Sequence, residues 1–328
     1  MEEFRTELKL KPSEHKISLH HPILTLGSCF ADSIGQKLQT AKFLVSKNPF
    51  GTVYNPLSIH KQLLQSVHNQ PALEHSFLQN QGMALNYDFH SEFAGTSKPQ
   101  LETKINEAIG HTHHFLKNTK YLLLTYGTSC VYERLDTNEV VANCHKMPAQ
   151  QFKKFLLTQK KILESFDQTY QAVKIFNSDI KIILTVSPVR HLKDTLELNS
   201  VSKSILRLTC HTLTELYDDV EYFPAYEILL DDLRDYRFYS SDLIHPTSDA
   251  VDYIWKKFSA KYFDLETKIF LEEWQEIAKA LSHKPFQPSS QAHQIFLKET
   301  LKRLQELKSK VDVSKEIRSI EAQLMPNT

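Results

Sequence analysis

The sequence has 328 residues, with 39 lysines and arginines against 39 aspartates and glutamates, so its formal net charge is zero. A chain of this length can bury a sizeable core without disulfides or metals to staple it. The balanced charge gives no net field toward nucleic acid or an anionic membrane, so we expect neither as a partner and a small or neutral ligand instead.

The cysteines and the N-terminal segment indicate a cytoplasmic protein. The four cysteines form no Cys-x-x-Cys pair, as expected of thiols in a reducing compartment. The first residues, MEEFRTELKLKPSEHK, are charged and lack the apolar stretch of a secretory signal. No apolar run is long enough to cross a bilayer.

Short apolar runs and longer periodic segments alternate along the first 217 residues. The runs at 22–27, 120–127 and 181–188 predict buried strands, each ending in glycine or Ser-Pro. Helical periodicity appears at about 56–67, 101–118, 150–177 and 196–217. This alternation favours an α/β fold with a mainly parallel sheet, whose ligands bind at the carboxyl ends of the strands.

The composition changes near residue 264, beyond which there is neither a strand pattern nor a glycine. Two amphipathic helices are predicted there, with apolar side chains at helical spacing at Leu297, Leu301, Leu304 and Val311. We therefore divide the chain into an α/β domain, 1–263, and a helical appendage, 264–328. The sequence leaves open whether the appendage packs on the domain, forms a solvated hairpin or joins copies into a homo-oligomer.

A serine and an Asp-His pair are the candidate catalytic residues. Ser28 follows Gly27 at the end of the first predicted strand, but Gly-Ser ends many strands. Asp242 and His245 lie three residues apart just before the last helix of the domain. A carboxylate can hold one imidazole nitrogen and leave the other free to take a proton from a serine. Each residue alone is more often an ordinary turn or loop residue.

Five ordered blocks of the chain resemble the bacterial GSCFA-domain family, itself similar to the SGNH (GDSL-like) hydrolases: GSCFADSIG, NPFGTVYNPLSI, VANCHK, TVSPVRHLKD and YFPAYEILLDDLRDYRFYSSDLIHPT. The resemblance spans about residues 20–262 and does not reach the appendage. It implies an SGNH-hydrolase-like three-layer sandwich with Ser28 as nucleophile and Asp242 and His245 completing a triad. It also implies that the backbone N–H groups of Ser28 and Gly51 form an oxyanion hole.

One block departs from the SGNH pattern. Where those enzymes have Gly-x-Asn at a strand end, this chain has Gly127-Thr128-Ser129, so the usual amide donor to the oxyanion is missing. Asn143 is the expected replacement, with the hydroxyls of Thr128 and Ser129 as alternatives. Because losing one such donor typically slows turnover about a hundredfold or more, a slow enzyme and a binding protein both stay open.

Arg190 and His191 follow the third predicted strand on the ligand side, which makes them candidate substrate-binding residues. Capping of neighbouring carbonyls is an equal alternative for Arg190. Asn48 and Asn55 are expected to shape a turn, and His145 to be a core or surface histidine.

Two rival chemistries rank below the serine mechanism. Cys29 could be a nucleophile at a helix N-terminus, but we expect it to pack as a small apolar residue. His111, His113 and His114 lie on a predicted helix on which only His111 and His114 share a face, so a surface or interface cluster is favoured over a metal site. No nucleotide-binding motif occurs, and we expect no cofactor.

Together these features predict a serine esterase or deacylase that acts on a small-molecule or carbohydrate ester through an acyl-enzyme. An acyltransferase would use the same triad. The non-enzymatic alternatives are a carbohydrate- or partner-binding protein and a scaffold that works through its C-terminal helices.

Overall fold

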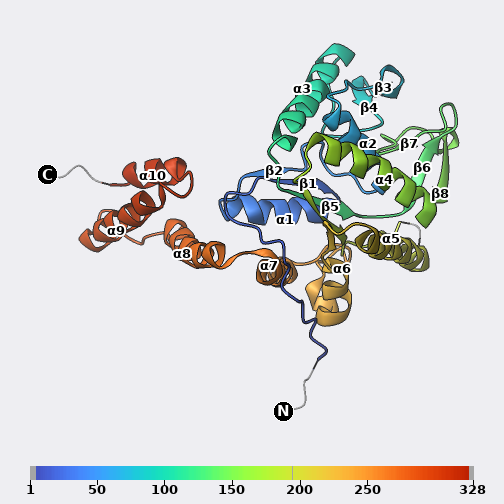
Figure 1. Cartoon of the computed structure of the whole chain (residues 1–328). Coiled ribbons are helices and arrows are strands. Elements are labelled where there is room, and N and C mark those ends of the chain that lie inside the picture. The colour runs from blue at the N-terminus through green and yellow to red at the C-terminus, as the bar shows by residue number, and fades with distance from the viewer. Residues whose placement is uncertain (1–4, 194, 325–328) are drawn as a thin grey trace.

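The computed structural model describes residues 5–193 and 195–324 and is built around a five-stranded sheet (Figure 1). The strands, in their order across the sheet, are β10 (Val220–Tyr222), β9 (Lys181–Val186), β5 (Tyr121–Tyr126), β1 (Ile23–Gly27) and β2 (Val45–Lys47). All neighbouring strands pair in parallel. The predicted α/β fold with a parallel sheet is thus confirmed, and the three predicted strands are its centre.

The strand order places a topological switch point between β1 and β5. From β1 the chain moves outward to β2, then crosses back to β5 and continues in the other direction through β9 and β10. In open parallel sheets, ligands bind at such a point, outside the carboxyl ends of the strands. Ser28 follows β1 and Gly127 follows β5, so both lie at this position.

Helices cover both faces of the sheet. One face packs against α2 (Pro56–Val67), α4 (Gln159–Phe176) and α5 (Leu196–Leu216), with α3 (Lys98–Leu116) in the same cluster. The other packs against α1 (Cys29–Thr40) and α7 (Ser248–Tyr262). In β5, Leu122 and Leu124 join the first cluster and Tyr121 and Leu123 the second. Burial on both faces explains why the central strands read as unbroken apolar runs.

Smaller elements flank the core. A three-stranded antiparallel sheet consists of β6 (Cys130–Arg134), β7 (Val140–Val141) and β8 (Phe152–Leu156), and a hairpin of β3 (Phe77–Asn80) and β4 (Met83–Asn86). Short helical turns lie at Glu74–Ser76, Ala149–Gln151, α6 (Ala225–Glu227) and Tyr236–Phe238, and a π-helix at Ile228–Leu233.

The predicted helix over 150–177 is wrong in its first part. Residues 152–156 form β8, which pairs with β6 and sets Lys154 opposite Tyr132. Its lysine lies 5.3 Å from the centre of that ring. The helix starts only at Gln159, where the Thr158 side chain accepts the N–H of Lys161. A cross-strand partner distant in sequence decides this segment, and periodicity cannot reveal such a partner.

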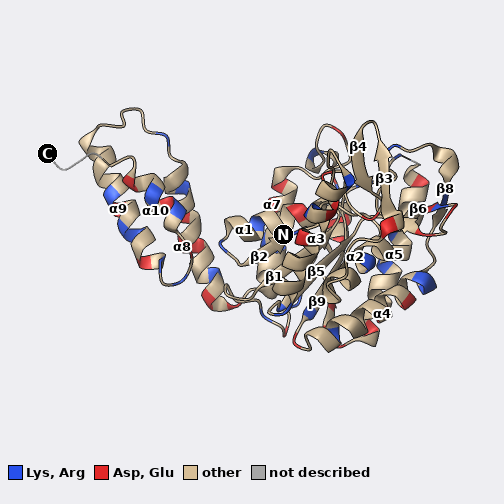
Figure 2. Ribbon diagram, turned by 90° about the horizontal axis from the view of Figure 1, so that it is seen from above, with Lys and Arg blue, Asp and Glu red and all other residues tan. Residues whose placement is uncertain are grey.

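As far as residue 324, where the described part of the appendage ends, it has three helices rather than the two expected: α8 (Leu265–Ser282), α9 (Gln291–Leu307) and α10 (Ser314–Glu321). They extend from the α1 side of the sheet (Figure 2). The indole of Trp274 donates to the Thr40 carbonyl at 2.7 Å, and Lys42 bonds Glu316 at 2.7 Å. Leu297 and Leu304 are buried, so the predicted apolar stripe is covered by this chain itself. No helix within the described ranges is both long and apolar enough to span a bilayer.

Candidate active site

Ser28 is held at the junction of β1 and α1. It is the N-cap of α1, where its Oγ accepts the N–H of Phe30 at 3.4 Å, and it is only 1% exposed. Its own N–H donates to the Thr125 carbonyl at 3.1 Å. The preceding Gly27 has φ +136°, and a Cβ there would lie 2.1 Å from that same carbonyl oxygen. Only glycine allows this approach of β1 to β5.

The turn around Gly51 is held by side-chain amides. The Asn48 side chain accepts the Gly27 N–H at 2.8 Å and donates to the Gly27 carbonyl at 3.2 Å. Asn55 caps α2 by accepting the Ser58 N–H at 2.9 Å. Both asparagines therefore shape the turn, as predicted.

Neither backbone N–H assigned to the oxyanion hole is free in this structure. The Ser28 N–H is bonded to Thr125, and the Gly51 N–H donates to the Asn48 carbonyl at 2.8 Å. Gly51 has φ +72°, and a Cβ there would lie 2.6 Å from His90 Cβ, so close packing also explains this glycine. A role for either N–H in catalysis requires its present bond to rearrange.

Asp242 and His245 form a hydrogen-bonded pair on an exposed turn. His245 Nδ1 and Asp242 Oδ2 are 2.7 Å apart, and Asp242 Oδ1 accepts the N–H groups of Ile244 and His245 at 2.9 and 3.0 Å. The bond from the His245 ring, followed by these backbone bonds, lowers the pKa of Asp242 to about 2. The ionised carboxylate therefore orients the imidazole and leaves Nε2 for other chemistry.

Arg190 ties this turn to the end of β9. Its N–H donates to the Ile244 carbonyl at 3.2 Å and its Nη1 to the Leu243 carbonyl at 3.4 Å. The guanidinium lies 3.9 Å from the centre of the Tyr239 ring. Arg190 therefore caps carbonyls, as one of the two alternatives predicted, and a substrate contact of its guanidinium stays a prediction.

His191 and Ser28 both lie close to Gly127. A Cβ built on Gly127 would lie 3.0 Å from the Tyr54 carbonyl oxygen, 3.2 Å from His191 Nε2 and 3.3 Å from Ser28 Cβ. We call the space bounded by these three groups the Gly127 notch. Among the described residues, no group hydrogen-bonds His191 Nε2, which is buried. Burial, then the charges of Lys203 and His245, lowers the pKa of His191 to about 3.

The candidate triad is thus gathered at one end of the sheet, but its central contact is not formed. His191 Nε2 and Ser28 Cβ both lie beside Gly127, and Arg190, the residue before His191, is bonded to the turn that carries His245. In the part of the chain that the structure describes, no hydrogen bond joins Ser28 to His245, and Ser28 Oγ instead accepts the Phe30 N–H.

The hydroxyl alternatives for the missing amide are engaged elsewhere. Ser129 is fully buried and donates to the Ser202 carbonyl at 3.3 Å, and Thr128 Oγ1 lies 2.9 Å from Ser202 Oγ. Ser202 belongs to α5, so α5 and not the ligand holds both hydroxyls. Both hydroxyls are thus engaged by Ser202, and their role as oxyanion donors stays a prediction.

Asn143 lines a cleft of about 500 Å³ together with Tyr54, Tyr132, Phe152 and His191. Its Oδ1 accepts the His145 N–H at 2.8 Å, and its amide nitrogen donates to no group of the described residues. Asn143 thus keeps a free donor in the cleft, which is compatible with the predicted role without establishing a contact to Ser28.

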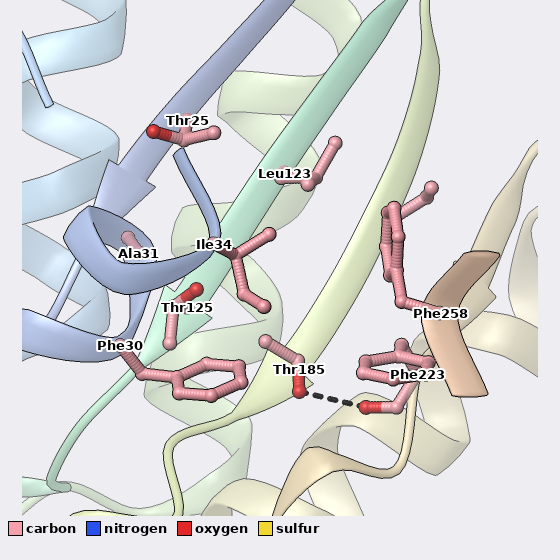
Figure 3. A pocket seen from close by; sticks show the side chains of 10 residues that line it. Thr25, Phe30, Ala31, Ile34, Leu123, Thr125, Thr185, Phe223 and Phe258 are labelled. Carbon is pink, nitrogen blue, oxygen red and sulfur yellow. Dashed lines mark hydrogen bonds between the residues drawn. The ribbon is translucent and has the colours of Figure 1, made fainter. Parts of the chain in front are cut away.

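A second cavity is not a substrate site. It lies between α1 and the sheet, has about 20 Å³, and is lined by Phe30, Ile34, Phe258 and threonines of three strands (Figure 3). Thr185 donates to the Phe223 carbonyl at its edge. A space that holds about one water, with no titratable group on its wall, is a gap in core packing.

The remaining predictions concern thiols and imidazoles. His145 is a core histidine as predicted, with Nε2 2.7 Å from the Asn86 carbonyl. Cys29 is partly exposed, and its Sγ lies 3.7 Å from Tyr54 Oη, instead of packing between β1 and α1. His113 Nδ1 bonds the Ser66 carbonyl, and within residues 5–193 and 195–324 no three histidine, cysteine or acidic side chains are grouped to hold a metal.

Sequence reasoning missed Lys203. This fully buried lysine of α5 donates to the carbonyls of Gly127 and Ser187, both at 2.7 Å, at the ends of β5 and β9. Burial lowers its pKa to about 7. The signal was available, because Lys203 falls on the apolar face that Leu206 and Cys210 continue.

The chain matches known protein families over most of its length. The GSCFA family model matches residues 22–258, and the model of the C-terminal domain of GSCFA domain proteins matches residues 274–326. No curated protein matches the chain. A solved structure from Streptococcus pneumonia, provisionally described as a platelet activating factor, aligns over 74% of this chain and 86% of its own at 14% identity. Its TM-score of 0.38 identifies neither fold nor activity.

Proposed function

We propose that this chain, which belongs to the GSCFA family, is a cytoplasmic serine hydrolase of the SGNH type, with the corresponding three-layer sandwich fold, that cleaves an ester or related acyl group. The observation that carries the proposal is the Asp242–His245 pair. Its 2.7 Å bond lies on a turn that Arg190 fastens to the end of the sheet where Ser28 lies. The switch-point position of Ser28 supports the same assignment.

In the proposed reaction, Ser28 Oγ attacks the acyl carbon while its proton passes to His245 Nε2. The carbonyl electron pair moves to oxygen and forms the tetrahedral oxyanion. The intermediate collapses with cleavage of the bond to the leaving alcohol, which takes the proton from the imidazolium. Water then attacks the acyl carbon and gives a proton to His245. The bond between that carbon and Ser28 Oγ breaks, the carboxylic acid leaves, and Ser28 Oγ takes the proton back from the imidazolium.

The cleft supports an acylated carbohydrate as the substrate class. Tyr54, Tyr132 and Phe152 offer faces on which a sugar ring can pack, and the Asn143 amide is free to bind a hydroxyl. Water as acceptor makes the protein an esterase or deacylase. A sugar hydroxyl as acceptor would make it an acyltransferase with the same residues.

The test is covalent labelling with a serine-directed fluorophosphonate, read by intact-protein mass. We expect one adduct per wild-type chain, localised to Ser28 by peptide mapping, and none on Ser28→Ala. Cys29→Ala is the matched control and should label like wild type. Absence of labelling on folded wild-type protein would reject the enzyme in favour of a carbohydrate- or partner-binding protein, and labelling lost with Cys29→Ala would reject the serine mechanism.

A further inference from the structure

The Gly127 notch contains a polar atom that the triad does not use. His191 Nε2 is buried, and no group of the described residues hydrogen-bonds it. Buried polar atoms are nearly always paired, so an unpaired one beside a candidate nucleophile needs an explanation. Resting on the proposed function, we propose that His191 donates its Nε2–H to the oxyanion and so replaces the missing amide of the third block.

The position of the atom supports this role. His191 Nε2 and Ser28 Cβ both lie within 3.3 Å of the Cβ position of Gly127. An oxygen on the carbon that bonds Ser28 Oγ must lie near Ser28 Cβ, and on the Gly127 side it would come within reach of His191 Nε2. A Cβ on Gly127 would crowd all three groups of the notch, so glycine is the residue that leaves room between them. A donor that reaches into it can stabilise charge as the charge develops.

His191 suits a donor better than a general base. Within the described residues no carboxylate contacts its ring, whereas His245 has Asp242 at 2.7 Å. Burial lowers the pKa of His191 to about 3, so the ring stays neutral and keeps one N–H. A neutral imidazole gives a hydrogen bond without competing for the proton of Ser28.

The surroundings hold the ring in place. The backbone N–H of His191 donates to Asn199 Oδ1 at 2.9 Å. The imidazole ring packs edge-on against the ring of Tyr54, with centroids 5.4 Å apart. Beneath the notch, Lys203 fastens the Gly127 carbonyl at 2.7 Å. A donor fixed before the reaction does not have to reorganise during it.

Two substitutions at His191 distinguish the effect of its N–H donor from the effect of the volume of its ring. His191→Phe keeps the ring but removes the N–H, and His191→Gln restores an N–H donor. With an aryl ester as substrate, we expect His191→Phe to lower kcat about a hundredfold with KM changed less than threefold. His191→Gln should recover at least tenfold of that loss. His245→Gln should stay inactive, because glutamine cannot act as a base.

A second pair of variants tests the notch without touching the imidazole. Gly127→Ala should lower kcat/KM at least tenfold, because the methyl would lie 3.3 Å or less from Ser28 Cβ, His191 Nε2 and the Tyr54 carbonyl. Gly110→Ala is the control, since the nearest atom to its methyl would be 3.8 Å away. Melting temperatures identify any variant that loses activity by unfolding.

The outcomes separate this inference from the proposed function. If Ser28→Ala abolishes turnover while folded His191→Phe and Gly127→Ala keep wild-type kcat, the serine hydrolase stands and the His191 donor is wrong. If His191→Gln is as inactive as His191→Phe and His245→Gln retains activity, His191 is the base instead. If Asn143→Ala alone loses a hundredfold in kcat, Asn143 supplies the donor. Turnover by folded Ser28→Ala overturns the proposed function itself.

Discussion

The two ends of the candidate triad are built in opposite ways. Ser28 is 1% exposed, and its N–H and hydroxyl are both engaged in the bonds that join β1, β5 and α1. Asp242 and His245 have side chains that are 45% and 46% exposed, on a turn outside the sheet. The turn is held by the bonds of Arg190 to the Leu243 and Ile244 carbonyls and by the Ser240 N–H, which donates to the His245 carbonyl at 2.8 Å.

Because of this contrast, stability and activity can be changed separately at the two ends. A change beside Ser28 disturbs the central sheet, because the same groups that place the nucleophile also join the strands. A change in the turn disturbs the orientation of an imidazole and little else. We therefore expect stability effects to dominate at one end and rate effects at the other.

The largest expected effect on stability is that of a substitution at Gly27. Gly27→Ala would put a methyl 2.1 Å from the Thr125 carbonyl oxygen at φ +136°, so β1 and β5 must separate. We expect a loss of about 4 kcal/mol or more in the free energy of unfolding, measured by urea denaturation. Gly82→Ala is the control: its φ is +76° but no atom lies within 4 Å, so about 1 kcal/mol is expected. Equal losses would mean that backbone conformation, and not strand contact, dictates Gly27.

At Asp242 we expect a large loss of rate with little loss of stability. Asp242→Asn keeps the size of the side chain but removes the charge that selects the imidazole tautomer, so kcat should fall about a thousandfold. The melting temperature should stay within about 2 °C of wild type, because the turn is exposed. Esterase assays and thermal melts of the same sample measure both quantities. A stable variant with full kcat would show that His245 acts without this partner.

Arg190 should have a smaller effect on rate. Arg190→Ala removes the Nη1 bond to Leu243 and the stack on Tyr239, which lets the turn and His245 move. Small misplacements of a catalytic group lower rates substantially, so we expect kcat to fall about tenfold with the melting temperature nearly unchanged. Arg237→Ala, in the same segment but 74% exposed at its side chain, should leave kcat unchanged. If both variants behave alike, Arg190 does not position the turn.

The sequence predicted the parts of this molecule that depend on local pattern. The central strands were found because burial on both faces makes them continuously apolar. The three-residue strands β2 and β10 were not, because so short a run has no periodicity. The pattern of β8 predicts helix, because its Lys-rich sequence only becomes a strand beside β6.

The same division applies to the site. The Asp242–His245 contact follows from their spacing of three residues and was predicted. The resemblance assigned the N–H groups of Ser28 and Gly51 to the oxyanion hole, but their actual partners are backbone carbonyls that only the folded chain brings near. The approach of His191 to Gly127 depends on Asn199 and Lys203 of α5, and no local motif encodes it.

The smallest expected effect is on the pH dependence of the unfolding free energy. It also differs between the buried sheet and the exposed turn of Asp242 and His245. On the buried side, His60 bonds Tyr126 and Ser165 at 2.7 and 2.8 Å, and burial lowers its pKa to about 3. On the exposed turn, the pKa of Asp242 is about 2, so that carboxylate stays ionised over the same range.

Between the ordinary histidine pKa of about 6.5 and about 3, the unfolded chain takes up a proton at His60 that the folded chain does not. Stability therefore falls as pH decreases through this window, by about 1.4 kcal/mol per pH unit for this one group. In His60→Gln, which keeps polar atoms at the site, the slope of unfolding free energy against pH should be shallower by that amount at pH 4–6. Asp242→Asn should leave the slope of wild type unchanged above about pH 5, because the Asp242 carboxyl is ionised there in both the folded and the unfolded chain. If His60→Gln has the same slope as wild type, His60 takes up a proton in the folded state as readily as in the unfolded chain. The acid sensitivity of the fold would then come from another buried histidine, such as His191.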